Sequence, residues 1–496
     1  MKNIKTCIIL LGCILLGLQA AGQETVRLDL ASTIRMANDS SLTAFRNRNM
    51  YLKGYWEHQT FKANRLPLLS LDLSPAQYYR YITPRYDSQE DMDVYREQQM
   101  FSAGGALKLQ QNLDITGGTF YVESALERMY NSGETRYSQF SSIPVRIGYS
   151  QELIGFNALK WEKKIEPLKF EKVKKEFLYN SEMVSEEAVT YFFNVAMAQL
   201  DYEMALKQVE SSDTLYKIGM QRHKIAAISK ADLLTLELDM VIARNSLENS
   251  RISLKRATFA LASFLNLEKD IKIEVELPER PGELVIPMET ALEMAMANSP
   301  SLLEHQQTIL EAEREVSRTK AESYLNASVN LSVGFNQVAD NLKNAYRHPL
   351  QQDIISVNLN VPIVDWGVRK GRHNMAKNDL NVAEISARQK EAGLEEEVFI
   401  TVEDFNIQKG LIGSAEEALK LADMAYAQTM QRFMIGKADV NSMAMALSRK
   451  QEAQRNWLHT LQNYWLNYYK IRRLTLYDFE AGASLSEMFD YSSIIY

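Results

Sequence analysis

The sequence contains only two cysteines, Cys7 and Cys13, and both lie close to its start. They fall in a segment with a basic region at Lys2 and Lys5, an apolar run and small residues after it. This arrangement is typical of a secretory signal peptide, which we expect to cover residues 1–22. The mature chain would then have no cysteine, which excludes a disulfide, a thiolate nucleophile and a thiolate metal site. Lipoprotein processing at Cys13 is the alternative.

Long apolar runs, an excess of basic residues and catalytic motifs are also missing. Beyond Leu18 no apolar run approaches the ~20 residues that a membrane-spanning helix needs. The formal net charge is −7, which argues against a nucleic-acid partner. The six histidines form no H-E-x-x-H pair, and there is no P-loop, G-x-S-x-G or G-x-G-x-x-G segment. We therefore expect an exported chain with no enzyme activity, no cofactor and no resident metal.

Proline is absent from two long windows, residues 168–277 and 363–496, and the first window holds a single glycine, Gly219. Because proline breaks helix interiors, both windows can be helical over most of their length. Apolar residues recur in them three or four apart, with Glu and Lys between. A helix from about Asn157 to Lys224 would be about 100 Å long at 1.5 Å per residue. Helices of this length predict a coiled-coil architecture.

Between these windows the apolar period changes from 3.6 to 2. Val329–Phe335 and Ile355–Ile363 alternate clearly with Asn, Ser or Gly, and weaker segments lie at 69–73, 107–115 and 145–149. Strands of about ten residues with one apolar face and one small or polar face fit a membrane β-barrel with a wet lumen. An ordinary half-buried sheet is the alternative. The signal peptide and the lack of another globular core favour the barrel.

The chain also repeats itself. MQRHKIAAISKADLL at Met220–Leu234 returns 210 residues later as MQRFMIGKADVNSM at Met430–Met443. RMANDSSL at 35–42 likewise returns as AMANSPSL at 295–302. Self-similarity of this kind predicts two structural repeats.

The predicted boundaries follow from these matches. The first repeat is expected at 23–282, with helices in 28–64, strands within 67–154 and long helices at about 157–266. The second is expected at 283–480, with helices in 287–324, strands within 327–364, long helices at about 367–472, and a C-terminal tail at 481–496.

The predicted strands are too few to close a barrel within one chain. Each repeat supplies two strands in its simplest form, whereas the smallest membrane barrels have eight, and an open sheet edge in lipid is prohibitive. Several copies must therefore share one barrel. The first repeat also has surplus residues at 75–142, including an extra hairpin at 104–128 that turns at DITGG. The sequence leaves open whether this hairpin joins the barrel.

Taken together, these features resemble the TolC-type outer-membrane efflux family. The resemblance covers about Leu28 to Phe479. It rests on the two repeats, the strand-loop-strand insert in each, the segment that recurs after each long helix, and the closing RRLTLYDFEAG at Arg472–Gly482. It implies a mainly helical, TolC-like fold, with long coiled-coil helices in a periplasmic α-barrel and strands in a shared outer-membrane β-barrel. It also implies a homotrimer with a twelve-stranded barrel, four strands from each chain.

The function that the resemblance implies is the outer-membrane channel of a tripartite efflux or type I secretion system. A periplasmic adaptor and an inner-membrane pump would feed a passive duct that crosses the outer-membrane lipid. The adaptor would open this duct at its periplasmic tip. The alternative is a non-conducting coiled-coil scaffold in the periplasm or at the cell surface, which would not need alternating strands at matched places in both halves.

In that family the recurring segment marks the helix-to-helix turns at the tip. The positions that correspond to its adaptor-docking tripeptides are Ile225, Ala226 and Ala227 in the first repeat and Ile435, Gly436 and Lys437 in the second. Gly436 would permit the close approach of a partner backbone, or it only relieves the turn.

The positions that correspond to the narrow periplasmic aperture of the family are Asp232 and Thr235 in the first repeat and Ser442 and Met445 in the second. Only the first of these is acidic, so no acidic ring forms in the second repeat. Asp232 is expected either to bond to a basic residue of the tip, Lys437 or Lys230, or simply to cap the start of a helix.

Overall fold

The computed structural model describes residues 25–132, 136–225, 228–268, 271–279, 282, 284–323 and 325–495. The predicted signal peptide and Cys13 lie outside these residues. The chain forms two compact units: unit 1 is Met1–Leu52, Lys174–Pro300 and Glu391–Tyr496, and unit 2 is Lys53–Val173 and Ser301–Lys390. None of the helices in the described ranges combines the length and the apolar character that a membrane span requires.

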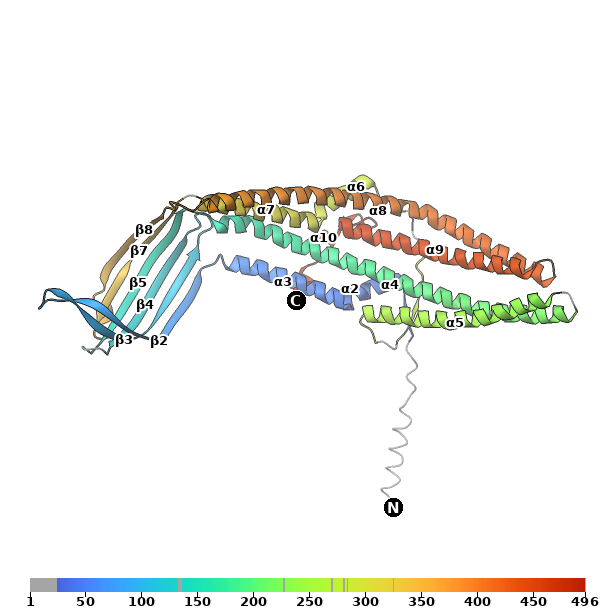
Figure 1. The fold of residues 1–496 in the computed structure, drawn as a ribbon, viewed down its shortest axis with the longest axis horizontal. Helices are drawn as coiled ribbons and strands as arrows, with labels where there is room; N and C mark the ends of the chain where they lie inside the picture. The colour runs from blue at the N-terminus through green and yellow to red at the C-terminus, as the bar shows by residue number, and fades with distance from the viewer. Residues whose placement is uncertain are drawn as a thin grey trace, which may run out of the picture. The chain divides into compact units, whose positions relative to one another are not determined.

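The same order of helices occurs in both halves of the chain (Figure 1). In each half, two shorter helices precede a group of strands, and a 67-residue helix and a helix about half as long follow it. The elements are α2 (Leu30–Ser40), α3 (Leu42–Ala63), α4 (Ala158–Lys224) and α5 (Lys230–Phe264), and then α6 (Met288–Asn298), α7 (Pro300–Glu322), α8 (Val368–Met434) and α9 (Val440–Thr475). The predicted long helices are therefore confirmed. Pro167 lies inside α4, so this helix begins before the proline-free window of residues 168–277.

Unit 2 contains a six-stranded sheet in which every neighbouring pair is antiparallel. The spatial order is β2-β3-β4-β5-β7-β8, so the surplus hairpin of the first repeat, β3 and β4, lies within the sheet. The strands are β2 (Leu68–Asp87), β3 (Met92–Asn112), β4 (Thr119–Asn131), β5 (Tyr137–Ile154), β7 (Asn326–Ala339) and β8 (Leu350–Asn360). Among the residues that the structure describes, no further strand lies beside the outer edge of β2 or of β8.

One face of the sheet is apolar on all six strands. The register places Leu71 beside Leu107 and Ile147 beside Val333, and both pairs lie on this face. Its other large members include Leu69, Leu73, Leu109, Phe120, Val122, Val145, Leu331, Phe335, Ile355, Val357 and Leu359. The opposite face carries a row of polar and charged residues, Ser70, Lys108, Glu123 and Arg146, on β2 to β5. Alternation of this kind follows from the two-residue period of a strand.

Two predictions about the strands are wrong in detail. The predicted length of about ten residues is too short for β2 and β3, which have 20 and 21 residues. Their outer parts, Arg80–Asp87 and Met92–Gln99, pair with each other and project beyond the rest of the sheet (Figure 1). The strand predicted to reach Ile363 ends at Asn360, because Pro362 has no N–H to donate and restricts the residue before it.

Unit 1 holds the main hydrophobic core. A short parallel pair, β1 (Thr25–Leu28) and β6 (Lys272–Val275), packs together with side chains of the helices. Phe192 and Phe193 of α4 and Leu261 of α5 are almost completely buried there. The C-terminal tail forms β9 (Tyr477–Asp478), β10 (Ala483–Ser484), α10 (Leu485–Met488) and α11 (Ser492–Ile495).

Candidate functional site

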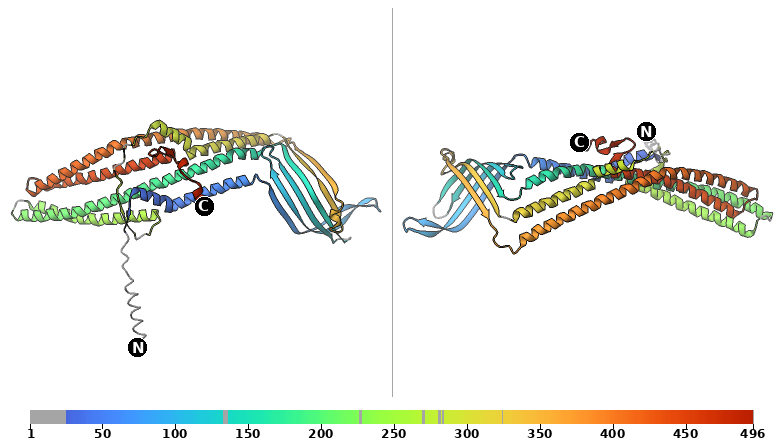
Figure 2. Two further views of the ribbon diagram at one scale, coloured as in Figure 1. Left: turned by 180° about the vertical axis from the view of Figure 1, so that it is seen from behind. Right: turned by 90° about the horizontal axis from the view of Figure 1, so that it is seen from above.

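The recurring sequence segments form two helix-to-helix turns, which lie side by side in unit 1 (Figures 1 and 2). The first turn joins α4 to α5 and the second joins α8 to α9. Helix α4 ends at Lys224 and α8 at Met434, and α5 begins at Lys230 and α9 at Val440. The 210-residue offset of the sequence is therefore preserved residue for residue in the ends of the helices.

The second turn is closed by a glycine in the left-handed region. Gly436 has φ +80°, its N–H donates to the carbonyl of Phe433 at 3.0 Å, and the N–H of Lys437 donates to the carbonyl of Arg432 at 2.8 Å. This is a common way to end a helix, because glycine adopts positive φ without a steric penalty. Gly436 thus ends α8 in the way expected of a residue that relieves the turn.

Arg222 of α4 joins the two turns. Its Nη2 donates to the carbonyls of Phe433 at 2.8 Å and Met434 at 2.9 Å, at the C-terminal end of α8. The guanidinium carbon lies 5.2 Å from the centroid of the Phe433 ring. A cation in this position satisfies carbonyls that have no partner within the helix, and it complements the partial negative charge at the helix end.

The start of each second helix is capped by its own side chains. Ser229 and Asp232 form a reciprocal capping box: the N–H of Asp232 donates to Ser229 Oγ at 3.1 Å, and the N–H of Ser229 donates to Asp232 Oδ2 at 3.1 Å. In the second turn, the N–H of Ser442 donates to Asp439 Oδ1 at 2.7 Å. The hydroxyl and the N–H of Ser442 hold the pKa of Asp439 below its usual range. Both caps are typical of helix N-termini.

The predicted docking residues that the structure describes lie in these turns. Ile225 and Ile435 are strongly exposed, at 76% and 66% of their surface, and Gly436 and Lys437 are exposed beside the second. Ala226 and Ala227 lie outside the described residues.

The predicted aperture residues all lie in the first two turns of α5 and α9. Asp232 and Lys437 line the same cavity of about 430 Å³ between the two helix pairs, but within the described ranges no ion pair joins Asp232 to Lys437 or to Lys230. Thr235 donates its hydroxyl to the carbonyl of Ala231 at 3.0 Å. Ser442 and Met445 line a second cavity of about 510 Å³ on the α8–α9 pair.

A small apolar cluster lies under the turns. Leu215, Leu236, Phe433 and Met443 are each less than 10% exposed and come from all four helices. Gly219 allows α4 to approach α5 closely here, because a Cβ on this residue would lie 2.5 Å from Leu236 Cδ1. The cluster and Arg222 therefore hold the two turns of one chain together.

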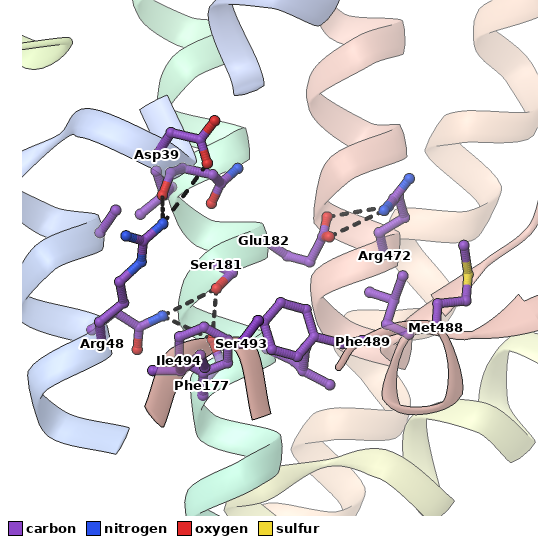
Figure 3. Close-up of a pocket in the computed structure, with 16 residues that line it drawn as sticks. Asp39, Arg48, Phe177, Ser181, Glu182, Arg472, Met488, Phe489, Ser493 and Ile494 are labelled. Carbon is purple, nitrogen blue, oxygen red and sulfur yellow. Dashed lines mark hydrogen bonds and ion pairs between the residues drawn. The ribbon is translucent and has the colours of Figure 1, made fainter. Parts of the chain in front are cut away.

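A second feature of unit 1 is a cavity of about 760 Å³ under the C-terminal tail, which Figure 3 shows. Arg472 of α9 binds both carboxylate oxygens of Glu182 at 3.1 Å and Asp478 Oδ2 at 2.8 Å. Burial raises the pKa of Glu182, and the guanidinium of Arg472 acts in the opposite direction. Phe489 of the tail packs against Phe177 of α4 with ring centroids 5.1 Å apart.

Sequence reasoning missed Arg222 and the Arg472–Glu182 pair. Arg222 stands inside the recurring MQR segment and Arg472 inside RRLTLYDFEAG, so both were visible as part of a pattern. Neither pattern shows that Arg222 reaches the end of α8 or that Arg472 reaches Glu182, because these partners are more than two hundred residues away.

Comparison with known protein families gives a match in the second half of the chain. Residues 291–475, most of the second half, match the family model described as Outer membrane efflux protein. This part of the chain is therefore similar to outer membrane efflux proteins, and the chain has a TolC-like fold. No curated protein sequence matches it.

Solved structures confirm the fold over nearly the whole chain. The Campylobacter jejuni CmeC outer membrane channel aligns with a TM-score of 0.65 and 13% identity, covering 94% of this chain and 88% of that one. The outer membrane protein VceC from Vibrio cholerae gives 0.63 and 14%, covering 90% and 95%. The Neisseria gonorrhoeae MtrE outer membrane channel, solved in its open state, gives 0.59 and 12%, covering 90% and 88%. At these identities the likeness concerns the fold.

Proposed function

We propose that this protein is the outer-membrane channel of a tripartite efflux or type I secretion system. It would act as a passive homotrimeric duct, closed at its periplasmic tip and opened by a periplasmic adaptor. The observation that carries the proposal is the six-stranded sheet of unit 2, with one apolar face and two unpaired edges. The efflux-protein match and the fold support the same function.

The apolar face of the sheet suits the hydrocarbon core of the outer membrane. Large apolar side chains such as Leu71 and Ile355 are 61% and 78% exposed in a single chain, and a lipid surface would cover them. The opposite face would line a wet lumen. There Arg146 Nη2 lies 2.9 Å from Glu123 Oε2, and the ammonium of Lys108 lies 5.2 Å from the ring centroid of Tyr121.

The unpaired edges require other copies of the chain. A free sheet edge cannot lie in lipid, because its N–H and C=O groups would have no partners. Strands β2 and β8 run in opposite directions, so β8 of one copy can pair antiparallel with β2 of the next. Three copies of the six-stranded sheet would close an eighteen-stranded barrel, rather than the twelve-stranded one that the sequence resemblance implies.

The adaptor would dock at the two turns. Ile225 and Ile435 offer exposed apolar contacts there, and Gly436 leaves the backbone open to close approach. The predicted positions Ala226, Ala227 and Lys437 belong to the same proposed surface. Six such turns would surround the tip of a homotrimer.

Opening at the tip would be a shift of the helix pairs relative to one another. The proposed aperture positions are Asp232, Thr235, Ser442 and Met445, of which Asp232 is already engaged in a capping box. The closed state would therefore depend less on an acidic ring than on contacts such as Arg222 to the end of α8. The energy for export would come from an inner-membrane pump.

Planar-bilayer conductance of the purified oligomer tests this function. A gated duct gives small stepwise currents that rise when tip contacts are removed. An assembled trimer without any conductance would favour the alternative, a non-conducting coiled-coil scaffold. The scaffold has no need for the apolar sheet face, which is why the channel is preferred.

Docking is tested separately with a cysteine at Gly436. The predicted mature chain has no other thiol, so a thiol crosslinker placed there reports only on this turn. Capture of the cognate adaptor in the cell envelope is expected, and a cysteine at Lys207, well along α4, serves as the control. Equal capture from both positions would contradict the docking assignment.

A further inference from the structure

The cavity between the two turns is lined by residues of both repeats. Its lining from the first repeat is Gly219, Arg222, Ile228, Asp232 and Leu236. Its lining from the second repeat includes Phe433, Gly436, Asp439 and Val440, the end of α8 and the start of α9. The second repeat thus seats its turn against one face of the α4–α5 pair.

The corresponding face of the second repeat is empty in a single chain. The residues 210 positions after the five first-repeat residues are Thr429, Arg432, Ala438, Ser442 and Ala446, and all five line one groove of about 510 Å³ on the α8–α9 pair. The two cavities are neighbours that share Lys437 and Ala438, and their other lining residues differ. The groove is therefore the second-repeat equivalent of the α4–α5 face against which the α8–α9 turn lies. No described part of the same chain covers it.

The groove has the character of an unfinished interface. Leu421 and Met445 line it and are 55% and 52% exposed, which leaves apolar surface for a partner to cover. Three cationic side chains, Arg432, Lys437 and Arg449, also line it. The C-terminal end of a helix has a partial negative charge and carbonyls that require donors, so it suits this groove.

We propose that the groove receives the α4–α5 turn of a second copy of the chain, and that Arg432 donates to the carbonyls at the end of that copy's α4. Arg432 is the repeat equivalent of Arg222, and His223 and Lys224 are the equivalents of Phe433 and Met434. A ring of copies closes when each repeat contacts the next in the same way, first within a chain and then between chains. The inference rests on the proposed oligomer and assigns the residues of its tip seam.

A thiol crosslinking experiment tests the seam in the full-length protein. One chain carries Arg432→Cys, a second co-expressed chain carries Lys224→Cys, and a short bifunctional thiol reagent is added to the purified oligomer. Covalent dimers of the two chains are expected. The positive control is a single chain with Arg222→Cys and Met434→Cys, which should crosslink within itself because these residues are in contact.

The matched negative control replaces Lys224→Cys with Lys207→Cys, which lies on the same helix, is exposed, and is about 25 Å away at 1.5 Å per residue. Dimers from both pairs, or from neither, would overturn the proposal when the oligomer is intact by native electrophoresis and conducts ions. Capture of an adaptor at Arg432→Cys in place of a second copy would also overturn it. Loss of the oligomer and of conductance in the unmodified protein would instead count against the proposed function.

Discussion

The guanidinium of Arg222 donates to the carbonyl of Phe433 at 2.8 Å, so a side chain of the first repeat completes the last turn of a helix in the second. The same nitrogen reaches the carbonyl of Met434 at 2.9 Å. These two hydrogen bonds and the apolar cluster below them are the contacts that keep the two turns together.

Replacing Arg222 by methionine should therefore loosen the tip without unfolding the protein. Hydrogen bonds to a charged group contribute about 1.5–3 kcal/mol, and we expect a loss of about 2 kcal/mol in local stability at the end of α8. Hydrogen exchange of the amides before Met434 should accelerate, and conductance should rise. Arg256→Met, an exposed arginine of α5, is the matched control. Equal effects from both variants would contradict a specific role for Arg222.

Variants of Asp232 distinguish two roles for this residue, a charge that closes the aperture and a helix cap. Asp232→Asn keeps an oxygen acceptor for Ser229 but removes the charge, whereas Asp232→Ala and Ser229→Ala remove the capping box, which is worth about 1 kcal/mol at Ser229. If capping is its role, only the alanine variants should accelerate hydrogen exchange at the start of α5. A rise in conductance in Asp232→Asn with unchanged exchange would show instead that the charge itself closes the channel.

The cap at Asp439 should respond to pH in a defined window. Hydrogen bonds from Ser442 lower its pKa in the folded chain, so the carboxylate favours the folded state above its unfolded pKa of about 4. That contribution is lost as pH falls through the lowered folded pKa. Protection of the first α9 amides should persist from neutral pH to about pH 4 and decline below it. Asp439→Asn, which does not titrate, should show protection without this decline.

Much of the architecture could be predicted because it depends on local rules. The proline gaps predicted α4 and α8, since a helix of 67 residues tolerates almost no break. The recurring segment located both turns, because the same local chemistry ends one helix and caps the next. Ser229-x-x-Asp232 has the spacing of a capping box. The sequence therefore predicted a helix cap as one of two roles for Asp232.

Other features depend on contacts between residues that are far apart in the sequence, which a local pattern does not show. The position of β3 and β4 inside the sheet follows from pairing between strands, which alternation alone does not specify. The end of β8 at Asn360 was misplaced because an apolar alternation continues through Pro362, where the ladder cannot. The α8 carbonyls that Arg222 reaches and the Glu182 partner of Arg472 are remote in sequence, so no spacing rule could connect them.

The buried pair of Arg472 and Glu182 should be costly to break on one side only. Both side chains are less than 20% exposed, and removing one partner of a buried pair leaves an uncompensated charge that costs about 3–5 kcal/mol. We expect Arg472→Met to lower the midpoint of urea unfolding strongly. The double variant with Glu182→Gln should recover part of that loss, because the two changes are coupled. If the loss in the double variant equalled the sum of the losses in the two single variants, direct coupling would be contradicted.

Pairing between β2 and β8 of neighbouring copies decides whether β2 and β3 belong to the barrel wall. Because these are the two free edges of the sheet, a cysteine at Leu71 of one copy should form a disulfide with one on β8 of the next. The register between copies is found by scanning Ile355, Val357 and Leu359. Covalently linked trimers in denaturing electrophoresis are the expected result. A cysteine at Val122, on β4 in the middle of the sheet, should give none. Linkage from Val122 and not from Leu71 would place β2 and β3 outside the wall, and the barrel would then have fewer than eighteen strands.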